Sequence, residues 1–298
     1  MPFVFVLLWS TGFIAAKYSM PYAEPMTVLF MRYGGVVVCM LPLMALWHAP
    51  WPRRGAQPVA DAGAGASAMP GALDWRVIGH IAVAGLLMQA GYLGGVWSAA
   101  RVGLPAGLLA LIVGLQPILT VVFSSLMGER SSPRAWLGLF FGIAGVTLVV
   151  WNKLHVLGLP MIGVWLCVFA LFSITVGTLY QKRFCPVFDL RTGSLIQFSV
   201  SALACLPPMF LFETREVHWT LPLAGALLWS ILPLSIGATS LLFMMIRKGK
   251  ATKVTSLMYL TPPTTALMSW ALFGETFSLL AAAGMALAVL GTALVVGS

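Results

Sequence analysis

Stretches of about 20 apolar residues recur along almost the whole chain, and this is the length that an α-helix needs to cross a bilayer. Only 8% of the residues are charged and 60% are hydrophobic, which is far from the composition of a soluble domain. Because lipid offers no partners for backbone polar groups, such spans must be helices. The sequence therefore predicts an all-α integral membrane protein with ten transmembrane helices, at residues 2–20, 25–47, 77–99, 104–127, 133–151, 159–182, 190–212, 221–246, 252–274 and 277–297.

The fourth and fifth of these spans recur near the end of the chain. A shift of 146 positions aligns residues 101–150 with residues 247–296 without a gap and with fourteen identities. Both copies hold a proline 12 residues before a glutamate, and glycines on the fifth and tenth spans predict close packing between helices. Weak similarity between two hydrophobic halves is typical of repeat-built transporters. We therefore expect two five-helix halves, residues 1–152 and 153–298.

Lysine and arginine residues are unevenly distributed over the predicted loops. With a cytoplasmic N-terminus, the cytoplasmic loops hold twelve of them and the outer connections hold four. An excess of basic residues marks the cytoplasmic side, so both termini are expected there, and the net charge of +9 reports topology and not a nucleic-acid partner. Since each half has an odd number of spans, the second half is inverted relative to the first. A substrate cavity is then expected between the halves, near the bilayer midplane.

Short motifs accompany this organisation. The first span carries Trp9-Ser10-Thr11-Gly12-Phe13 and Lys17, and the sixth repeats part of that spacing with Gly177 and Lys182. Further motif residues are Pro25, Arg32, Pro117, Gly128 and Glu129. With the ten spans, these residues resemble the drug/metabolite transporter superfamily, in particular its EamA-type ten-helix exporters and their amino-acid-exporting branch. The resemblance implies a bacterial inner-membrane protein whose central cavity is lined by spans 1, 3, 4, 6, 8 and 9.

Polar and aromatic side chains recur on single faces of the spans expected around that cavity. Gln116 and Thr120 share a helical face, and Gln89 lies about one turn from Tyr92. The alternative is that such groups only bond neighbouring helices or belong to the interfacial aromatic belt. The candidate substrate-binding residues are Trp9, Gln89, Tyr92, Trp97, Gln116, Thr120, Trp165, Tyr180, Thr239 and Tyr259.

Two prolines occupy equivalent places, Pro117 about halfway along the fourth span and Pro263 about halfway along the ninth. Each removes a backbone hydrogen bond and kinks its helix. We interpret them as hinge candidates, with a fixed structural kink as the alternative. A kink leaves carbonyl groups that need other partners, such as water in a cavity.

Ionisable side chains inside spans are functional candidates by default. Lys17 lies close enough to the outer interface to extend toward water, and we interpret it as structural. Arg32 lies about 10 Å inward from Pro25, needs a carbonyl or acidic partner, and is also interpreted as structural. His80 lies on the face opposite to Gln89, with a proton relay as the minor alternative. The glutamates that end the fourth and ninth spans are expected to be structural.

A polar, uncharged wall with aromatic rings suits a zwitterion. We therefore expect a secondary transporter that exports small neutral metabolites, above all amino acids including aromatic or hydrophobic ones, by alternating access. Efflux of drugs or lipid-like metabolites is the alternative. An intramembrane enzyme is disfavoured, since the spans hold no nucleophile–base pair and no acidic metal cluster. No catalytic residue, metal or cofactor is expected, the four cysteines have no paired spacing, and the oligomeric state stays open, with a monomer possible.

Overall fold

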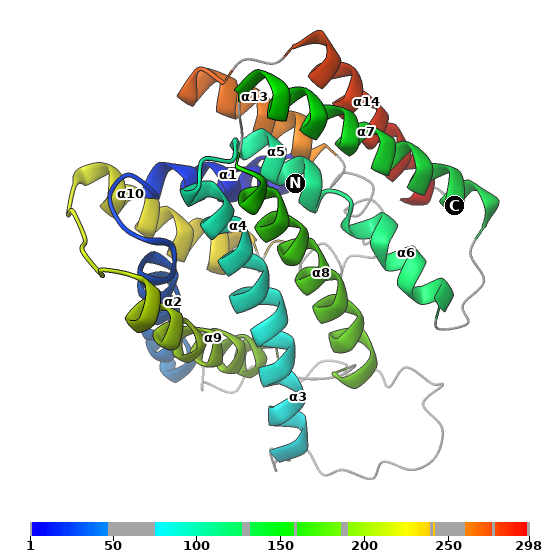
Figure 1. The fold of residues 1–298 in the computed structure, drawn as a ribbon. Coiled ribbons are helices and arrows are strands. Elements are labelled where there is room, and N and C mark those ends of the chain that lie inside the picture. Colours follow the sequence, from blue (N-terminus) through cyan, green and yellow to red (C-terminus); the bar gives the residue numbers. More distant parts are fainter. Residues whose placement is uncertain are drawn as a thin grey trace, which may run out of the picture.

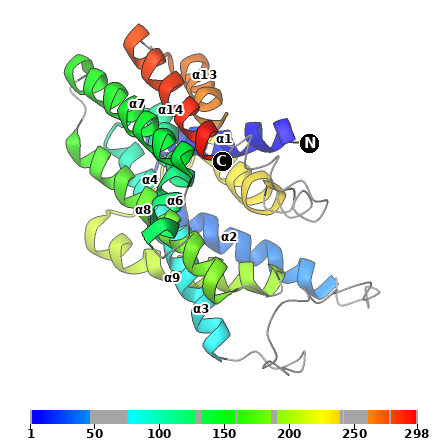
Figure 2. The ribbon, with the colours of Figure 1, turned by 90° about the vertical axis from the view of Figure 1, so that its right-hand side faces the viewer.

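The computed structural model describes residues 2–46, 75–126, 132–157, 160–185, 190–238, 241, 260–275 and 278–296, and helices account for almost all of them. These residues include parts of all ten predicted spans (Figures 1 and 2). In chain order the named elements are α1 Pro2–Ser19, α2 Pro25–Leu46, α3 Trp75–Gly85, η1 Leu86–Gly91, α4 Tyr92–Arg101, α5 Ala106–Val113, α6 Gln116–Leu126, α7 Pro133–Leu157, α8 Met161–Phe184, α9 Leu190–Phe212, α10 Leu221–Trp229, η2 Ser230–Ala238, α13 Thr261–Phe273 and α14 Leu279–Val296.

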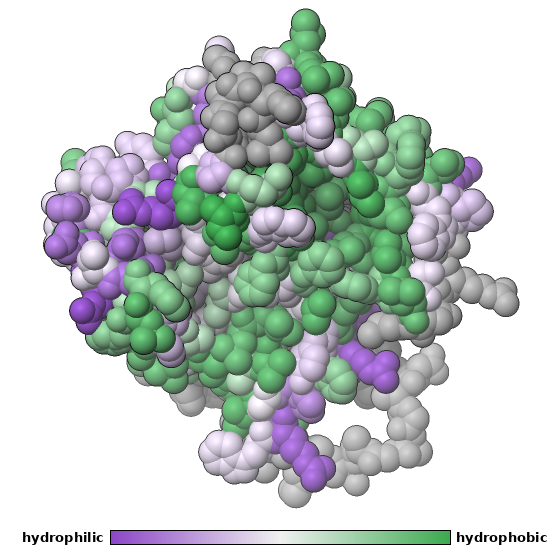
Figure 3. Space-filling model, viewed as in Figure 1, coloured by the Kyte–Doolittle hydropathy of each residue, from purple (hydrophilic) through white to green (hydrophobic). Residues whose placement is uncertain are grey.

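The outer surface of this helical assembly is apolar. Within the part of the chain that the structure describes, six helical segments are long and apolar enough to cross a membrane, and shorter apolar helices lie at Val4–Ser19, Trp136–Asn152 and Leu279–Leu294. Large side chains such as Phe140 of α7 and Phe169 of α8 are more than half exposed. Figure 3 shows hydrophobic residues over most of one face, with hydrophilic ones gathered mainly toward its edges. Such a surface suits a bilayer, because exposed apolar side chains can contact the hydrocarbon chains of the lipids.

The two halves pack symmetrically where α7 meets α14, which lie side by side in Figures 1 and 2. A Cβ atom at Gly145 would lie 2.4 Å from the carbonyl oxygen of Gly284, and one at Gly291 would lie 2.5 Å from that of Gly138. The shift of 146 positions superimposes Gly138 on Gly284 and Gly145 on Gly291. The same backbone approach therefore occurs twice with the halves exchanged, as a twofold-related repeat requires.

A second symmetric contact joins α2 to α9. The rings of Tyr33 and Phe198 lie 5.9 Å apart between their centroids. A shift of 165 positions, which superimposes Lys17 on Lys182, also superimposes Tyr33 on Phe198. Equivalent residues of the two halves thus touch each other, which locates the pseudo-twofold axis between these helices.

The third and eighth spans each contain a π-helical segment, η1 and η2. The shift of 146 positions places residues 86–91 of η1 over residues 232–237 within η2. Side-chain hydrogen bonds occupy backbone carbonyl groups of these segments: Tyr33 of α2 donates to the Gln89 carbonyl oxygen at 2.9 Å, and Ser235 donates to the Ser230 carbonyl oxygen at 2.8 Å. A π-helical turn widens the helix and is frequent at functional sites.

The fourth span is two helices and not one kinked helix as expected. Helix α5 ends at Val113 and α6 begins at Gln116, which places Pro117 in the first turn of α6. Pro263 likewise lies in the first turn of α13, which begins at Thr261. Proline is tolerated in a first helical turn because the N–H group there has no intrahelical partner. Each proline therefore starts a helix instead of bending one.

An ion pair links the C-terminal ends of α1 and α13, since Lys17 Nζ donates to Glu275 Oε1. The ammonium group also lies 4.8 Å from the centroid of the Phe273 ring. Lys17 therefore bonds across the two halves instead of simply extending toward water. Glu129, the equivalent of Glu275 in the first half, lies outside the described residues.

Candidate functional site

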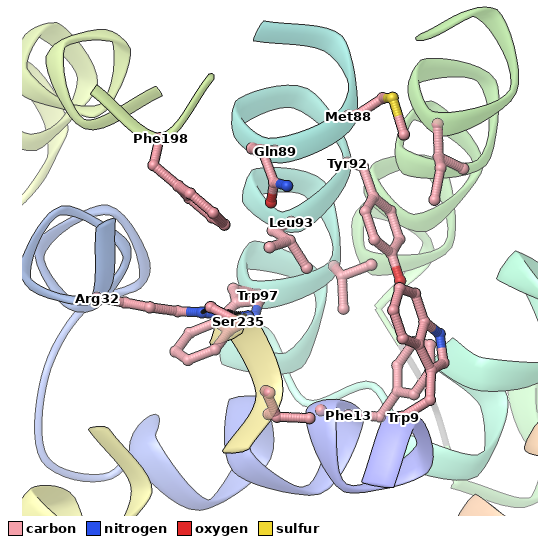
Figure 4. A pocket seen from close by; sticks show the side chains of 14 residues that line it. Trp9, Phe13, Arg32, Met88, Gln89, Tyr92, Leu93, Trp97, Phe198 and Ser235 are labelled. Atoms are coloured by element: carbon pink, nitrogen blue, oxygen red, sulfur yellow. Dashed lines mark hydrogen bonds between the residues drawn. The ribbon is translucent and has the colours of Figure 1, made fainter. Parts of the chain in front are cut away.

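A cavity of about 120 Å³ lies between the two halves (Figure 4). Its wall comes from α1, α2, η1, α4, α8, α9 and η2, that is, from the expected first, third, sixth and eighth spans and also from the second and seventh. The fourth and ninth spans, which were expected as well, provide none of its described wall residues. Eleven of the fourteen wall residues are apolar, aromatic or glycine. The wall consists of Trp9, Gly12, Phe13, Arg32, Met88, Gln89, Tyr92, Leu93, Val96, Trp97, Ile174, Phe198, Leu234 and Ser235.

A smaller hollow of about 40 Å³ adjoins this cavity and shares four of its wall residues. It reaches toward the break between α5 and α6, where Gly114, Gln116 and Pro117 line it. Helices α13 and α14 also contribute, through Thr261 and Thr292. The two hollows together give a space between the two halves, and the described residues that line it come from every predicted span except the fifth.

Five of the predicted binding residues lie at these hollows. Trp9, Gln89, Tyr92 and Trp97 line the larger cavity, and Trp9 and Tyr92 also line the smaller one together with Gln116. The π-helical register of η1 and the following helix α4 bring Gln89, Tyr92 and Trp97 to one wall, as Figure 4 shows. The Gln116 amide donates to the Thr178 hydroxyl at 3.1 Å, which holds its side chain between α6 and α8.

Three other predicted residues lie elsewhere. The Thr120 hydroxyl donates to the Gln116 carbonyl of its own helix at 2.8 Å. Trp165 is 64% exposed, because it lies nine residues before the cavity residue Ile174 and hence half a turn away from it on α8. The Tyr180 oxygen lies 2.7 Å from His80 Nδ1 and away from the cavity.

The remaining predicted residues add no further binding residue to the five that line the two hollows. Pro117 lines the smaller hollow, whereas Pro263 lines neither. Thr239 and Tyr259 lie outside the described residues. His80 stacks on Phe184, with ring centroids 5.0 Å apart, so its surroundings are an aromatic cluster at the ends of α3 and α8. Within the described ranges, His, Cys, Asp and Glu side chains form no group of three that could hold a metal ion.

Arg32 is a cavity-wall residue that the sequence interpretation assigned to structure alone. Its side chain is 7% exposed, lines the cavity, and donates from Nε and Nη2 to the Ser235 hydroxyl at 3.3 and 3.2 Å. The guanidinium carbon lies 5.9 Å from the Trp97 ring centroid. Within the described part of the chain no carboxylate lies at ion-pairing distance from it. The expectation of an uncharged wall is therefore wrong, and the signal was Arg32's depth within its span.

Comparison with known proteins agrees with this architecture. The model of the EamA-like transporter family matches residues 1–151 and 161–297, that is, once in each half. That family is one of transporters and not of enzymes. A solved crystal structure of another protein, 20% identical in sequence, superposes over 98% of this chain and 94% of its own with a TM-score of 0.64.

Two curated relatives have similar sequences. The chain is 31% identical over 197 residues to "Uncharacterized transporter YvbV" of Bacillus subtilis, covering 64% of this chain and 63% of that protein. It is 28% identical over 206 residues to "Uncharacterized inner membrane transporter YedA" of Escherichia coli, covering 68% of this chain and 66% of that protein. The matches thus span slightly less than two thirds of these relatives. The family model covers both halves, so the chain is a multi-pass membrane protein that belongs to the EamA-like transporter family.

Proposed function

We propose that the protein is a secondary transporter that exports small neutral metabolites, in particular amino acids with aromatic or hydrophobic side chains, across the bacterial inner membrane. The observation that carries this proposal is the cavity between the two halves, which combines aromatic rings with a few polar groups. Small-molecule sites are typically apolar pockets with a few convergent polar side chains. The cavity matches that description.

The chemistry of the wall divides into two parts. Trp9, Phe13 and Tyr92 offer ring faces to an apolar side chain. Gln89 and Arg32 offer polar groups to the ionic end of a zwitterion, which must be hydrogen-bonded in the site because burying a bare charge is costly. An amino acid presents both kinds of surface in one small molecule.

Alternating access would use the relation between the halves. In this proposal both termini lie in the cytoplasm, and the Lys17–Glu275 ion pair joins the outer ends of the first and ninth spans. Breaking that pair would let those ends separate, while the break before Pro117 lets α6 move relative to α5. Pro117 and Pro263 are the proposed hinge residues. The hinge proposal rests on their equivalent places in the two halves.

Efflux of drugs or lipid-like compounds is the second candidate. The mainly apolar wall of the larger cavity favours it, because only three of the fourteen wall residues, Arg32, Gln89 and Ser235, have polar or charged side chains. A purely hydrophobic compound would contact the aromatic rings and make no hydrogen bond to these polar groups. The two candidates therefore differ in whether replacing the polar wall side chains by apolar ones weakens transport.

Uptake and efflux of a panel of labelled amino acids and dyes in proteoliposomes test the proposal. Gln89→Leu and Gln116→Leu keep the bulk of the side chain and remove its hydrogen bonds. A lost bond to a charged partner costs about 1.5–3 kcal/mol, so the half-saturation concentration for an amino acid is expected to rise about 10- to 150-fold. Gln181→Leu, outside both hollows, is the control. Unchanged half-saturation in both cavity variants, or transport of dyes alone, would exclude amino acids as the substrate.

A further inference from the structure

The cavity wall holds one charged side chain among the described residues, Arg32. We infer that Arg32 is the residue that binds the substrate, and that the group it binds is a single carboxylate. This inference rests on the proposed transport function and adds to it the substrate's required chemical group. Small monocarboxylates are then ligands, whereas amines and amides of the same shape are not.

The hydrogen bonds of Arg32 leave part of its donor capacity for a ligand. A guanidinium group has five N–H donors. Its bonds within the described residues go from Nε and Nη2 to one oxygen atom, that of Ser235. The Ser235 hydroxyl gives its own proton to the Ser230 carbonyl at 2.8 Å, so its oxygen is oriented to accept from Arg32. Ser235 thus positions the guanidinium group without neutralising its charge.

Figure 4 shows this arrangement from close by. Arg32 extends from α2 toward Ser235 and Trp97, at the edge of the space that Gln89, Leu93 and Tyr92 also face. The ring of Trp97 is 1% exposed and lies beside the guanidinium group, with 5.9 Å from Cζ to the ring centroid. The surrounding wall is mainly apolar, and a charge–charge contact is stronger there than in water.

The simplest alternative is that Arg32 only ties α2 to η2. The repeat supplies a comparison, because a shift of 165 positions superimposes Arg32 on Gln197 of α9. Gln197 is 8% exposed, neutral, and bonds the Gln181 side chain at 3.2 Å. Helix α9 nevertheless packs on the third span, where Ser201 donates to the Gly85 carbonyl at 3.1 Å. The fold accepts a neutral side chain at this position, so packing alone does not explain a buried cation.

Charge balance selects the carboxylate among anions. A buried charge is costly unless an opposite charge meets it. A monocarboxylate balances one guanidinium group and matches its planar fork with two parallel hydrogen bonds. A phosphate monoester carries close to two charges, and the described wall residues provide no second cation for it. The aromatic side chains near the site then suit an apolar body attached to the carboxylate.

The test uses four probes that share one ring and differ at one end: phenylalanine, 3-phenylpropanoate, 3-phenylpropanamide and phenylethylamine. Binding to the purified full chain in detergent is measured by calorimetry and by the shift of the melting temperature. The native protein is expected to bind 3-phenylpropanoate about 10- to 150-fold more tightly than its amide, as for a hydrogen bond to a charged group. Phenylalanine is expected to bind more tightly than phenylethylamine.

Two variants make this measurement specific to Arg32. Arg32→Gln introduces the side chain that the other half carries at this place, and is expected to abolish the preference for the acid over the amide. Arg134→Gln removes an equal charge at an exposed position of α7 and is expected to keep it. A general folding defect would weaken all four probes together, whereas loss of the anion site changes the ratio between acid and amide.

The inference is overturned if the native protein binds neither carboxylate, if it binds acid and amide equally, or if Arg32→Gln keeps the native ratio. Failure of the proposed function gives a different result. In that case carboxylate binding depends on Arg32 as expected, but labelled amino acids are not moved across proteoliposomes. Arg32→Lys separates charge from geometry, since it keeps the charge, loses the planar fork, and should retain only part of the preference.

Discussion

Two corners of the molecule are built on the same plan and hold different chemistry. In the first corner α2 packs on η2, and the residues that meet are Arg32, Gly35, Ile231 and Ser235. In the second corner α9 packs on the third span, and the residues that meet are Gly85, Gln197 and Ser201, with Gln89 one turn further along the third span. The repeat superimposes Arg32 on Gln197 and Gln89 on Ser235. The helices pack in a similar way in both corners, but only the first corner has a cation at this position, Arg32, where the second has Gln197.

The close approach of the helices is achieved differently in the two corners. In the first corner a Cβ atom on Gly35 of α2 would meet the Ile231 side chain, with 2.5 Å to Cδ1. In the second corner the glycine is on the other helix, since a Cβ atom at Gly85 would lie 2.7 Å from the Gln197 Cα atom. A small residue is needed once per corner, and either partner can supply it. The close approach therefore requires that one of the two contacting residues be small, and does not fix which helix carries it.

Gln197→Arg is expected to give the largest effect, because it copies the first corner's cation into the second corner. Gln197 lines neither hollow and has the Gln181 amide as its hydrogen-bond partner. A buried charge left without an opposite partner costs about 3–5 kcal/mol, and we expect the free energy of unfolding in detergent to fall by that amount. Gln197→Met is the neutral control of similar length. If the arginine variant is as stable as native, the two corners are chemically interchangeable.

Gly85→Ala and Gly35→Ala compare the two corners at a single methyl group. The methyl group at position 85 meets backbone, which cannot rotate away, so a loss of about 1–3 kcal/mol of unfolding free energy is expected. The methyl group at position 35 meets the flexible end of Ile231, and a smaller loss is expected. Gly34→Ala, which has nothing within 4 Å, is the control and should be neutral or slightly stabilising. Equal losses at 35 and 85 would contradict the asymmetry.

Much of this fold could be predicted because it follows from hydropathy and repetition. Apolar length gives the spans, and the glycines on the fifth and tenth spans predict close packing between helices, which the structure shows between α7 and α14. The interruptions could not be predicted in the same way. Residues 86–91 have no composition that distinguishes a π-helical turn from an α-helix, since the difference lies in which carbonyl group each N–H group reaches.

Pro117→Ala and Pro263→Ala test whether equivalent helix starts act as equivalent hinges. Each variant lets the preceding segment continue as helix more easily, because alanine supplies the missing N–H group and favours helix. We expect stability to change little and transport to slow by about tenfold, which corresponds to about 1.4 kcal/mol on the barrier. Transport rates in proteoliposomes measure this, with Pro160→Ala, at the N-cap of α8, as the control. Native rates in both variants would mean that the prolines only start their helices.

The candidate site shows a different limit of sequence reasoning. Span membership and helical face predicted Trp9, Gln89 and Tyr92 at the cavity, and these residues line it in the structure. The same reasoning predicted Trp165 there, but its side chain is mostly exposed. Periodicity orders residues around one helix without telling which face its neighbours cover. Arg32 was known to be deep in the membrane from its distance to Pro25 alone. Its role depended on whether a carboxylate lay opposite, and that is a tertiary fact.

Ser235→Ala and Ser201→Ala should produce the smallest changes and the sharpest contrast. Each serine bonds across its corner: the Ser235 hydroxyl accepts from Nε and Nη2 of Arg32, and the Ser201 hydroxyl donates to the Gly85 carbonyl. Interhelical bonds of this kind average about 0.6 kcal/mol in membranes, so both variants should lose about that much stability. Only Ser235→Ala frees a cavity residue. Because the guanidinium group is then no longer held in position, the half-saturation concentration for a carboxylate substrate should rise about threefold, the affinity equivalent of 0.6 kcal/mol. Ser201→Ala should leave half-saturation at the native value, because Ser201 contacts neither hollow. Transport and unfolding are measured on both variants. An equal change of the half-saturation concentration in Ser235→Ala and Ser201→Ala would contradict the functional difference between the corners.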